Sequence, residues 1–143
     1  MDIEEKARRV DETFFKIILN EFHQLSVLDG NLKIRELLII KYLGKYNSVI
    51  MSELTSVFAT PPTTMTSIVN RLVDKGYVKR RRRDDDRRIV EILLSKKGQK
   101  FYDGHHKKGR DKTQKLLSIL SEREQEVFLD LVVKMSNNYK IDK

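Results

Sequence analysis

The sequence predicts a mostly α-helical fold that carries one small β-hairpin. Over most of the chain apolar residues recur at three- and four-residue steps, which is the spacing of an amphipathic helix. Between residues 77 and 94 they alternate instead, on either side of a charged run, as in two paired strands. We predict helices over about 3–28, 33–45, 51–58, 62–75 and 95–119, and a last helix that opens at residue 121.

The first predicted helix carries more apolar surface than a helix needs in order to pack against the core of a single chain. Two adjacent stripes run along it: Ile3, Ala7, Val10, Phe14 and Ile17 form one, and Phe15, Ile18, Phe22 and Leu25 the other. A single stripe is enough for a surface helix. We therefore expect one face to meet a partner chain. Asp29-Gly30-Asn31 then interrupts the pattern and predicts a turn.

The centre of the chain reads as two helices separated by a proline turn. Ala59-Thr60-Pro61-Pro62 is the predicted turn, and the stretch Ser48-Val49-Ile50 before the pair is short and β-branched. Thr60 is expected to cap the helix over 62–75, because prolines suit the first helical positions and threonine suits the cap. Gly76 predicts the end of that helix. Its apolar face consists of Met65, Ile68, Val69, Leu72 and Val73.

A hairpin and two further helices complete the predicted fold. One strand runs from Tyr77 to Arg82 and the other from Arg88 to Leu94, joined by residues 83–87. Ser95 is expected to cap the next helix, and Ser121-Glu122-Arg123-Glu124 has the pattern of a capping box. The middle of the helix over 95–119 is almost wholly polar. Helices of this kind often bridge two packed bodies through solvent.

The composition favours a polyanionic partner. The chain of 143 residues carries a formal net charge of +8, with a pI near 9.7 and 35% charged residues. Nucleic acid is the first expectation and an acidic membrane surface the second. The absence of cysteine excludes disulfides, thiolate zinc sites and thiol redox sensing. No apolar run reaches the length of a membrane span, and the charged N-terminus is unlike a signal peptide, so we expect a cytoplasmic protein with no membrane partner.

The exposed side of the helix over 62–75 suits contact with DNA bases. A helix-turn-helix places its second helix in the major groove, where side chains near its start meet base edges. Short hydroxyl side chains let the backbone approach, asparagine can pair with adenine, and arginine can pair with guanine or phosphate. The alternative is a face that is polar only because it meets water. The candidate residues are Thr63, Thr64, Thr66, Ser67, Asn70 and Arg71.

The hairpin is unusually rich in arginine. Lys79, Arg80, Arg81, Arg82, Arg83, Arg87 and Arg88 crowd one ribbon, and such crowding is unfavourable unless a polyanion is near. An arginine on a β-ribbon can enter a narrow minor groove, and Arg88 is the candidate for that role. The aspartates at 84–86 can hold a neighbouring guanidinium in a fixed fork, which we expect of Asp86. The candidate DNA-binding residues of the hairpin are Lys79, Arg82, Arg83, Asp86, Arg87 and Arg88.

The chain resembles the MarR family of winged helix-turn-helix transcriptional regulators. The resemblance covers about residues 32–100 in detail and the whole chain in layout, and it rests on three motifs taken together. These are the helix end RLVDKGYVKR, the Asp-x-Arg of the wing at Asp86-Arg87-Arg88, and the closing LLSKKG. Ser95 stands where the family usually has threonine, which is a conservative departure.

The resemblance implies a sequence-specific, double-stranded-DNA-binding regulator, most often a repressor, in which a homodimer binds a palindromic operator. It implies a winged domain over 31–99 and helical dimerisation regions over 1–30 and 100–143. An unidentified small-molecule effector can release such proteins from DNA; no other cofactor is implied. We expect an intersubunit core made of Phe14, Ile17, Ile18, Phe22, Val127, Phe128 and Leu131.

Other classes of protein are less well supported by the residues. No catalytic triad, phosphate loop or pair of carboxylates suited to acid–base chemistry is present, so an enzyme is not expected. His105 and His106 are adjacent and lack the spacing of paired helical metal ligands, and His23 lies far away in the chain, so no metal is expected. A winged helix used as a protein–protein module, and a nucleoid-type or RNA-binding protein with little sequence preference, stay open as alternatives.

Overall fold

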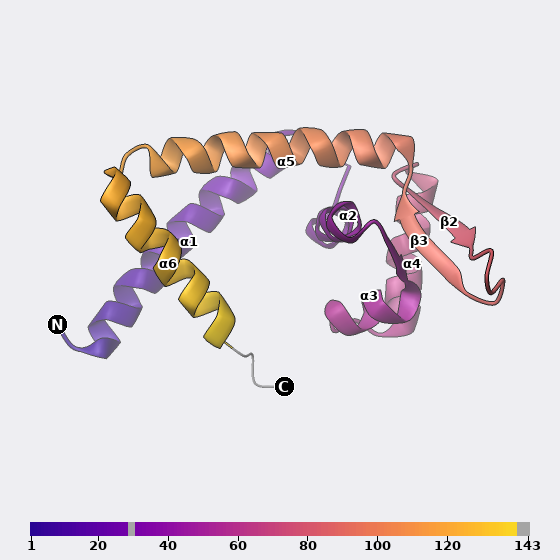
Figure 1. The fold of residues 1–143 in the computed structure, drawn as a ribbon, viewed down its shortest axis with the longest axis horizontal. Coiled ribbons are helices and arrows are strands. Elements are labelled where there is room, and N and C mark those ends of the chain that lie inside the picture. The colour runs from indigo at the N-terminus through magenta and orange to yellow at the C-terminus, as the bar shows by residue number, and fades with distance from the viewer. Residues whose placement is uncertain (29–30, 140–143) are drawn as a thin grey trace. The chain divides into compact units, whose positions relative to one another are not determined.

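The computed structural model describes residues 1–28 and 31–139, without the side chains of residues 21–28 (Figure 1). Its elements are α1 (Ile3–Leu28), α2 (Ile34–Tyr46), β1 (Ser48–Ile50), α3 (Met51–Val57), α4 (Pro62–Asp74), β2 (Val78–Arg82), β3 (Val90–Leu94), α5 (Lys96–Leu117) and α6 (Glu122–Asn138). The predicted fold class, mostly helical with a small β wing, is confirmed. The chain divides into two compact units, residues 1–39 and 40–143.

The first unit is dominated by α1. Glu4 and Glu5 lie in its first turn, where negative charge is favoured by the helix dipole. Arg8 bridges Glu5 and Glu12 one turn away on either side, at 2.7 and 2.6 Å. The apolar residues of both predicted stripes are exposed over much of the described helix, with Phe14 at 52%. The side chains of Phe22, His23 and Leu25 are outside the described part of the helix, and the expected turn at Asp29-Gly30 lies outside the described residues.

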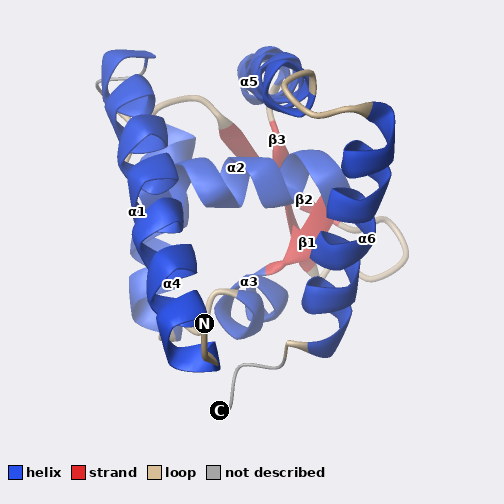
Figure 2. Cartoon of the chain, turned by 90° about the vertical axis from the view of Figure 1, so that its left-hand side faces the viewer, coloured by secondary structure: helices blue, strands red, loops and turns tan. Residues whose placement is uncertain are grey.

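The second unit contains a three-stranded antiparallel sheet in the order β1-β3-β2 (Figure 2). The hairpin of β2 and β3 was expected. The pairing of β1 with β3, with Val49 opposite Ile92, was not, because three residues carry too little pattern to indicate a strand. The strands of the hairpin pair in register from Val78 with Leu94 to Arg82 with Val90.

The buried apolar side chains come from α2, α3, α4 and the three strands. α3 packs against α4 and β1, and α4 packs against β2. The side of α4 that carries Met65, Ile68, Val69 and Leu72 is buried, as the helical spacing predicted. The buried apolar residues are Leu37, Ile39, Ile40, Leu43, Val49, Leu54, Met65, Ile68, Val69, Leu72, Val78, Ile92 and Leu94.

Helix ends agree with the sequence in most places and differ in one. The Ser95 side chain accepts a hydrogen bond from Gly98 N and caps α5, and Ser121 with Glu124 forms a capping box on α6. Thr60, however, does not cap α4. The N-cap residue is Pro61, which offers no side-chain hydrogen bond, and the Thr60 hydroxyl turns back to donate to the carbonyl of Phe58 at 2.9 Å.

Gly76 and Gly44 are both required by their surroundings. Gly76 ends α4 with a φ of +82°, a conformation that side chains disfavour, and this agrees with its predicted role as a stop. Gly44 lies inside α2 beneath the ring of Tyr102 from α5. A Cβ at position 44 would stand 2.3 Å from Tyr102 Cδ2, so the close approach of α5 to this part of α2 depends on the glycine. No helix in the described ranges is long and apolar enough to cross a membrane.

Candidate nucleic-acid interface

The candidate recognition surface is the exposed side of α4. Because Met65, Ile68, Val69 and Leu72 bury one side of the helix, the residues between them face solvent. Thr63, Thr64, Thr66, Ser67 and Asn70 are all exposed, and Arg71 is half-buried. The structure therefore brings the six residues expected from the sequence onto one helix, with the threonines nearest its N-terminus.

Several polar groups on this surface already have hydrogen-bond partners. The Thr66 hydroxyl donates to the carbonyl of Pro62 at 2.8 Å. Arg71 Nη1 donates to the Ser67 hydroxyl oxygen at 3.1 Å. Asn70 Oδ1 accepts a hydrogen bond from Nη2 of Arg80, a residue of the wing. The recognition surface is thus partly pre-ordered, and one of its links reaches the hairpin.

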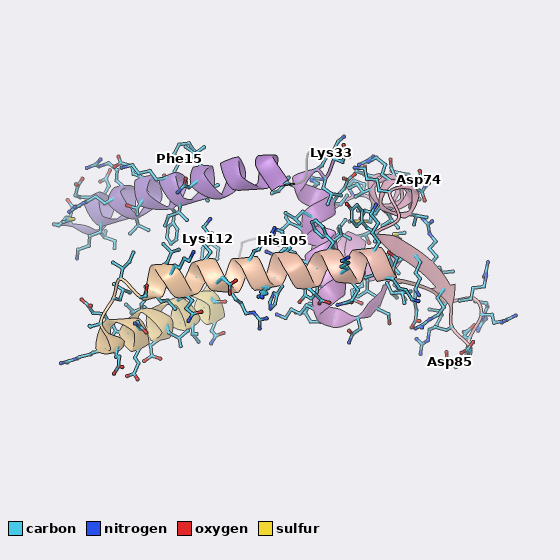
Figure 3. All side chains as sticks on the ribbon, turned by 90° about the horizontal axis from the view of Figure 1, so that it is seen from above. Phe15, Lys33, Asp74, Asp85, His105 and Lys112 are labelled. Carbon is cyan, nitrogen blue, oxygen red and sulfur yellow. The ribbon has the colours of Figure 1, made fainter. Side chains whose placement is uncertain are left out.

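The wing is the hairpin of β2 and β3 with the loop 83–89, and two arginine–aspartate forks lie in that loop. Arg88 Nε and Nη2 donate to the two carboxylate oxygens of Asp86, each at 3.0 Å, and the backbone N–H of Arg88 donates to Asp86 Oδ1 at 3.0 Å. Arg83 Nε and Nη2 donate to Asp85 at 3.0 and 2.9 Å. Figure 3 shows Asp85 at the far end of the hairpin.

The fork at Asp86 and Arg88 presents a charge to solvent. The Arg88 side chain is 91% exposed while that of Asp86 is 33% exposed, so the carboxylate lies on the inner side of the pair. Among the described residues nothing accepts a hydrogen bond from Arg88 Nη1, which is therefore available to an outside acceptor. The same geometry explains why β3 begins at Val90 and not at Arg88 as expected: Asp86 turns the chain by accepting from Arg88 N, and Ile89 N donates to Asp86 O at 3.0 Å.

The two forks shift the acidity of the aspartates. The hydrogen bonds from the Arg88 guanidinium, and next the one from its backbone N–H, lower the pKa of Asp86. Those from Arg83 lower the pKa of Asp85. Hydrogen bonding to the ionised carboxylate favours its charged form, so both aspartates stay negative throughout the neutral range.

The cations along the strands have different surroundings. Arg81 pairs with Glu91 across the hairpin at 2.8 Å, and Arg82 Nη1 donates to the carbonyl of Arg87 at 2.9 Å. Lys79 is exposed and forms no ion pair or hydrogen bond within the described part of the chain. The interactions of Arg80 with Asn70 and of Asp85 with Arg83 were not expected individually. The contact of Arg80 with Asn70 could have been anticipated from the alternation of side chains along β2. This alternation places Arg80 on the same face of the sheet as buried Val78.

The base of the wing is tied to the start of α5. Ser95 N donates to the carbonyl of Tyr77 at 3.0 Å, and Lys97 Nζ donates to the carbonyl of Lys75 at 2.7 Å while lying over the Tyr77 ring. Phe101 packs edge-on against Tyr77, with ring centroids 5.4 Å apart. These contacts join the end of α4, the hairpin and α5 into one body, which holds the wing beside the recognition helix.

The histidines of α5 lie on aromatic rings. His105 stacks on Phe101 and His106 on Tyr102, with centroids 5.8 and 5.4 Å apart. Within the described ranges no three histidine or acidic side chains come together as metal ligands would. His23 lies outside the described side chains.

This part of the chain combines a helix, a turn, a second helix with an exposed polar face, and a basic hairpin in one body. These elements together define the class of winged helix-turn-helix proteins. A model of the MarR family matches residues 32–90, and this confirms the resemblance to the MarR family that the sequence motifs indicated. A comparison with curated proteins gave no match.

Solved structures show the same fold over nearly the whole chain. FabT of Streptococcus pneumoniae, whose crystal structure is a complex with DNA, superposes with a TM-score of 0.80 at 26% identity, covering 92% of this chain and 95% of that chain. A MarR family protein from Bacillus stearothermophilus gives 0.79 at 19% identity, covering 96% and 97%. RV1404 from Mycobacterium tuberculosis gives 0.84 at 13% identity, covering 99% and 97%.

Proposed function

We propose that this protein is a transcriptional regulator that binds specific double-stranded DNA sequences as a homodimer and represses by occupying a palindromic operator. The proposal rests on the exposed polar face of α4, which is held in one body with the wing. On that wing, Asp86 fixes the guanidinium of Arg88 through two hydrogen bonds. The fold of FabT, crystallised with DNA, supports it.

Each part of this body has a distinct role in the proposal. The exposed face of α4 enters the major groove, where Thr63, Thr64 and the residues that follow meet base edges. Arg88 enters the adjacent minor groove, and its fork with Asp86 limits the side-chain freedom that binding would otherwise remove. Lys79 contacts phosphate and contributes affinity without sequence preference. A small-molecule effector that changes the spacing of the two recognition helices would release the DNA.

The test of this function is selection of bound duplexes from a random pool, followed by competition between the selected and random duplexes. We expect an enriched inverted repeat with half-sites about one helical turn, roughly 10 base pairs, apart. We expect the selected duplex to bind at least about a thousandfold more tightly than random duplex at physiological salt. Equal affinity for all duplexes would instead identify a nucleoid-type protein, and absence of DNA binding would identify a protein-interaction module.

The homodimer is a separate expectation, and it rests on apolar side chains left exposed in the single chain. On α1 these include Phe14, Ile17 and Ile18, and on α6 they include Val127, Phe128 and Leu131, with Phe128 at 52%. Phe128 and its neighbours line an apolar groove along α6. An exposed apolar surface of this extent is typical of an interface between subunits.

We expect sedimentation equilibrium to show a dimer at micromolar concentration. Phe128→Asp should shift the equilibrium to the monomer, because an ionised carboxylate in a dry interface is strongly unfavourable. Lys134→Asp, on the same helix, tests whether a new negative charge is enough by itself to dissociate the dimer. We expect this variant to remain dimeric. Helix content measured by circular dichroism verifies that both variants fold. A wild-type monomer at this concentration would contradict the expectation.

A further inference from the structure

The wing contacts the recognition helix through a polar link between Arg80 and Asn70. Arg80 Nη2, from β2, donates a hydrogen bond to Asn70 Oδ1, on the exposed face of α4. The register of the hairpin directs Arg80 to this contact. It lies opposite Ile92, on the face of the sheet that carries buried Val78, and α4 packs against β2. Both partners of the link are exposed, so it lies at the surface where the helix and the wing meet.

Arg80 keeps its positive charge available, unlike the neighbouring Arg81. The side chain of Arg81 points to the other face of the sheet and pairs with Glu91. Arg80 has no carboxylate partner in the part of the chain that the structure describes, and its acceptor there is the neutral amide of Asn70. A guanidinium carries five N–H donors. The link with Asn70 therefore orients the guanidinium and leaves most of its donors, and its whole charge, to an outside anion.

The position of the link matches the sugar–phosphate strand between two grooves. In the proposed complex α4 occupies the major groove and the wing the adjacent minor groove, and a single sugar–phosphate strand separates these grooves. Asn70 lies eight residues after Pro62 in α4, which is about 12 Å along a helix. The major groove is itself about 12 Å wide. When the start of α4 meets base edges, the link of Asn70 with Arg80 therefore lies at the rim of the groove, beside the phosphates.

Resting on the function proposed above, we propose that Arg80 binds a phosphate of the strand between the two grooves and that Asn70 is the residue that positions it. Such a contact fixes the register of the protein on the duplex without carrying a base preference. Because the amide already orders the guanidinium, less side-chain freedom is lost when DNA binds. A neutral residue of the recognition helix thus acts on DNA through a cation of the wing.

The experiment is a scan of the selected operator with methylphosphonate linkages, each of which removes the charge of a single phosphate. In the wild type, neutralising the phosphate that Arg80 binds should weaken binding by about tenfold, the scale of one charge-assisted hydrogen bond. Arg80→Ala should weaken binding to the unmodified operator by a similar factor and should be insensitive to this linkage. It should also reduce the slope of log affinity against log salt by about one.

Asn70→Ala tests the positioning role, because it changes no charge. It should weaken operator binding by about threefold, reduce the response to the same linkage and lower the salt slope. When it is added to Arg80→Ala, it should cause no further loss of affinity. A direct base contact by Asn70 would instead give a loss that persists in the Arg80→Ala protein and depends on the base pair at one operator position.

Arg81→Ala is the matched control. It removes the same charge from the adjacent position of the same strand, but Arg81 faces Glu91. Its response to each methylphosphonate linkage should equal that of the wild type, and adding Asn70→Ala to it should weaken binding as much as in the wild type. Circular dichroism verifies that every variant folds.

The outcomes separate the inference from the function on which it rests. If selection enriches no duplex, the proposed function is wrong and the inference falls with it. If an operator is selected but every linkage affects Arg80→Ala as strongly as the wild type, the inference alone is overturned. The same holds if the losses caused by Asn70→Ala and Arg80→Ala are additive.

Discussion

Replacement of Gly98 by alanine is expected to lower the free energy of unfolding of the body formed by α4, the hairpin and α5 by about 3 kcal/mol. This is at the upper end of the usual cost of inserting an extra methyl group into a well-packed site. A Cβ at position 98 would stand 1.9 Å from the carbonyl oxygen of Tyr77, which is backbone and cannot rotate away. That oxygen also accepts the hydrogen bond from Ser95 N, so a shift would disturb the junction of wing and α5. Urea unfolding followed by circular dichroism measures the loss.

Gly104→Ala provides the matched control on the same helix. Nothing lies within 4 Å of a Cβ built at Gly104. Alanine there should therefore stabilise the chain by about 0.5–1 kcal/mol, because it removes the conformational freedom of a glycine from a helix interior. If the Gly98 and Gly104 variants unfolded at the same urea concentration, this would contradict the close contact between position 98 and the carbonyl of Tyr77.

The second large effect concerns the fork at Asp86 and Arg88. We expect Arg88→Ala to weaken operator binding by about tenfold or more, which is the scale of one well-placed polar contact to DNA. The loss should be greatest where A/T-rich flanks narrow the minor groove. Asp86→Asn should also weaken binding, although it makes the wing more positive, because the bidentate ion pair that orients Arg88 is lost.

The sign of the Asp86→Asn effect distinguishes orientation from simple charge. Asp84→Asn makes the same change of charge two residues earlier in the loop, and Asp84 forms no ion pair with the described residues. It should therefore tighten binding slightly through reduced repulsion of phosphate. Tighter operator binding by both variants at fixed salt would reject the orienting role of Asp86.

Lys79→Ala serves as a second comparison for the wing. Because Lys79 is assigned a phosphate contact, its loss should weaken operator and random DNA by the same factor. It should also reduce the slope of log affinity against log salt by about one. The Arg88 variant, in contrast, should lose more on the operator than on random DNA.

Helical periodicity was sufficient to predict most of the fold. The spacing of Met65, Ile68, Val69 and Leu72 defined both the buried side of α4 and, by exclusion, the polar side that forms the candidate interface. Ser95 and the Ser121–Glu124 pair identified the starts of α5 and α6. These signals are local in sequence, because caps and amphipathic faces depend on residues within one or two turns.

The sequence also indicated the wing and the partner of Arg88. Asp86 and Arg88 are two residues apart, so their fork is closed within one loop and could be expected from the motif alone. The roles of these residues at DNA stay predictions until the variants are measured. Thr60 shows the limit of local rules, because its hydroxyl bonds to the carbonyl of Phe58 and leaves the start of α4 without a side-chain cap.

Other features depend on residues far apart in the chain, and these were decided by the tertiary structure. β1 is a strand because Val49 lies opposite Ile92, and Gly44 is needed because the ring of Tyr102 occupies the place of its Cβ. In the same way, the sequence placed Asn70 among the candidate DNA contacts, and only the packing of β2 against α4 brings Arg80 to its oxygen. Caps, stripes and turns are encoded within a few neighbouring residues, whereas a hydrogen bond or a close ring contact between two elements requires the whole fold to place them.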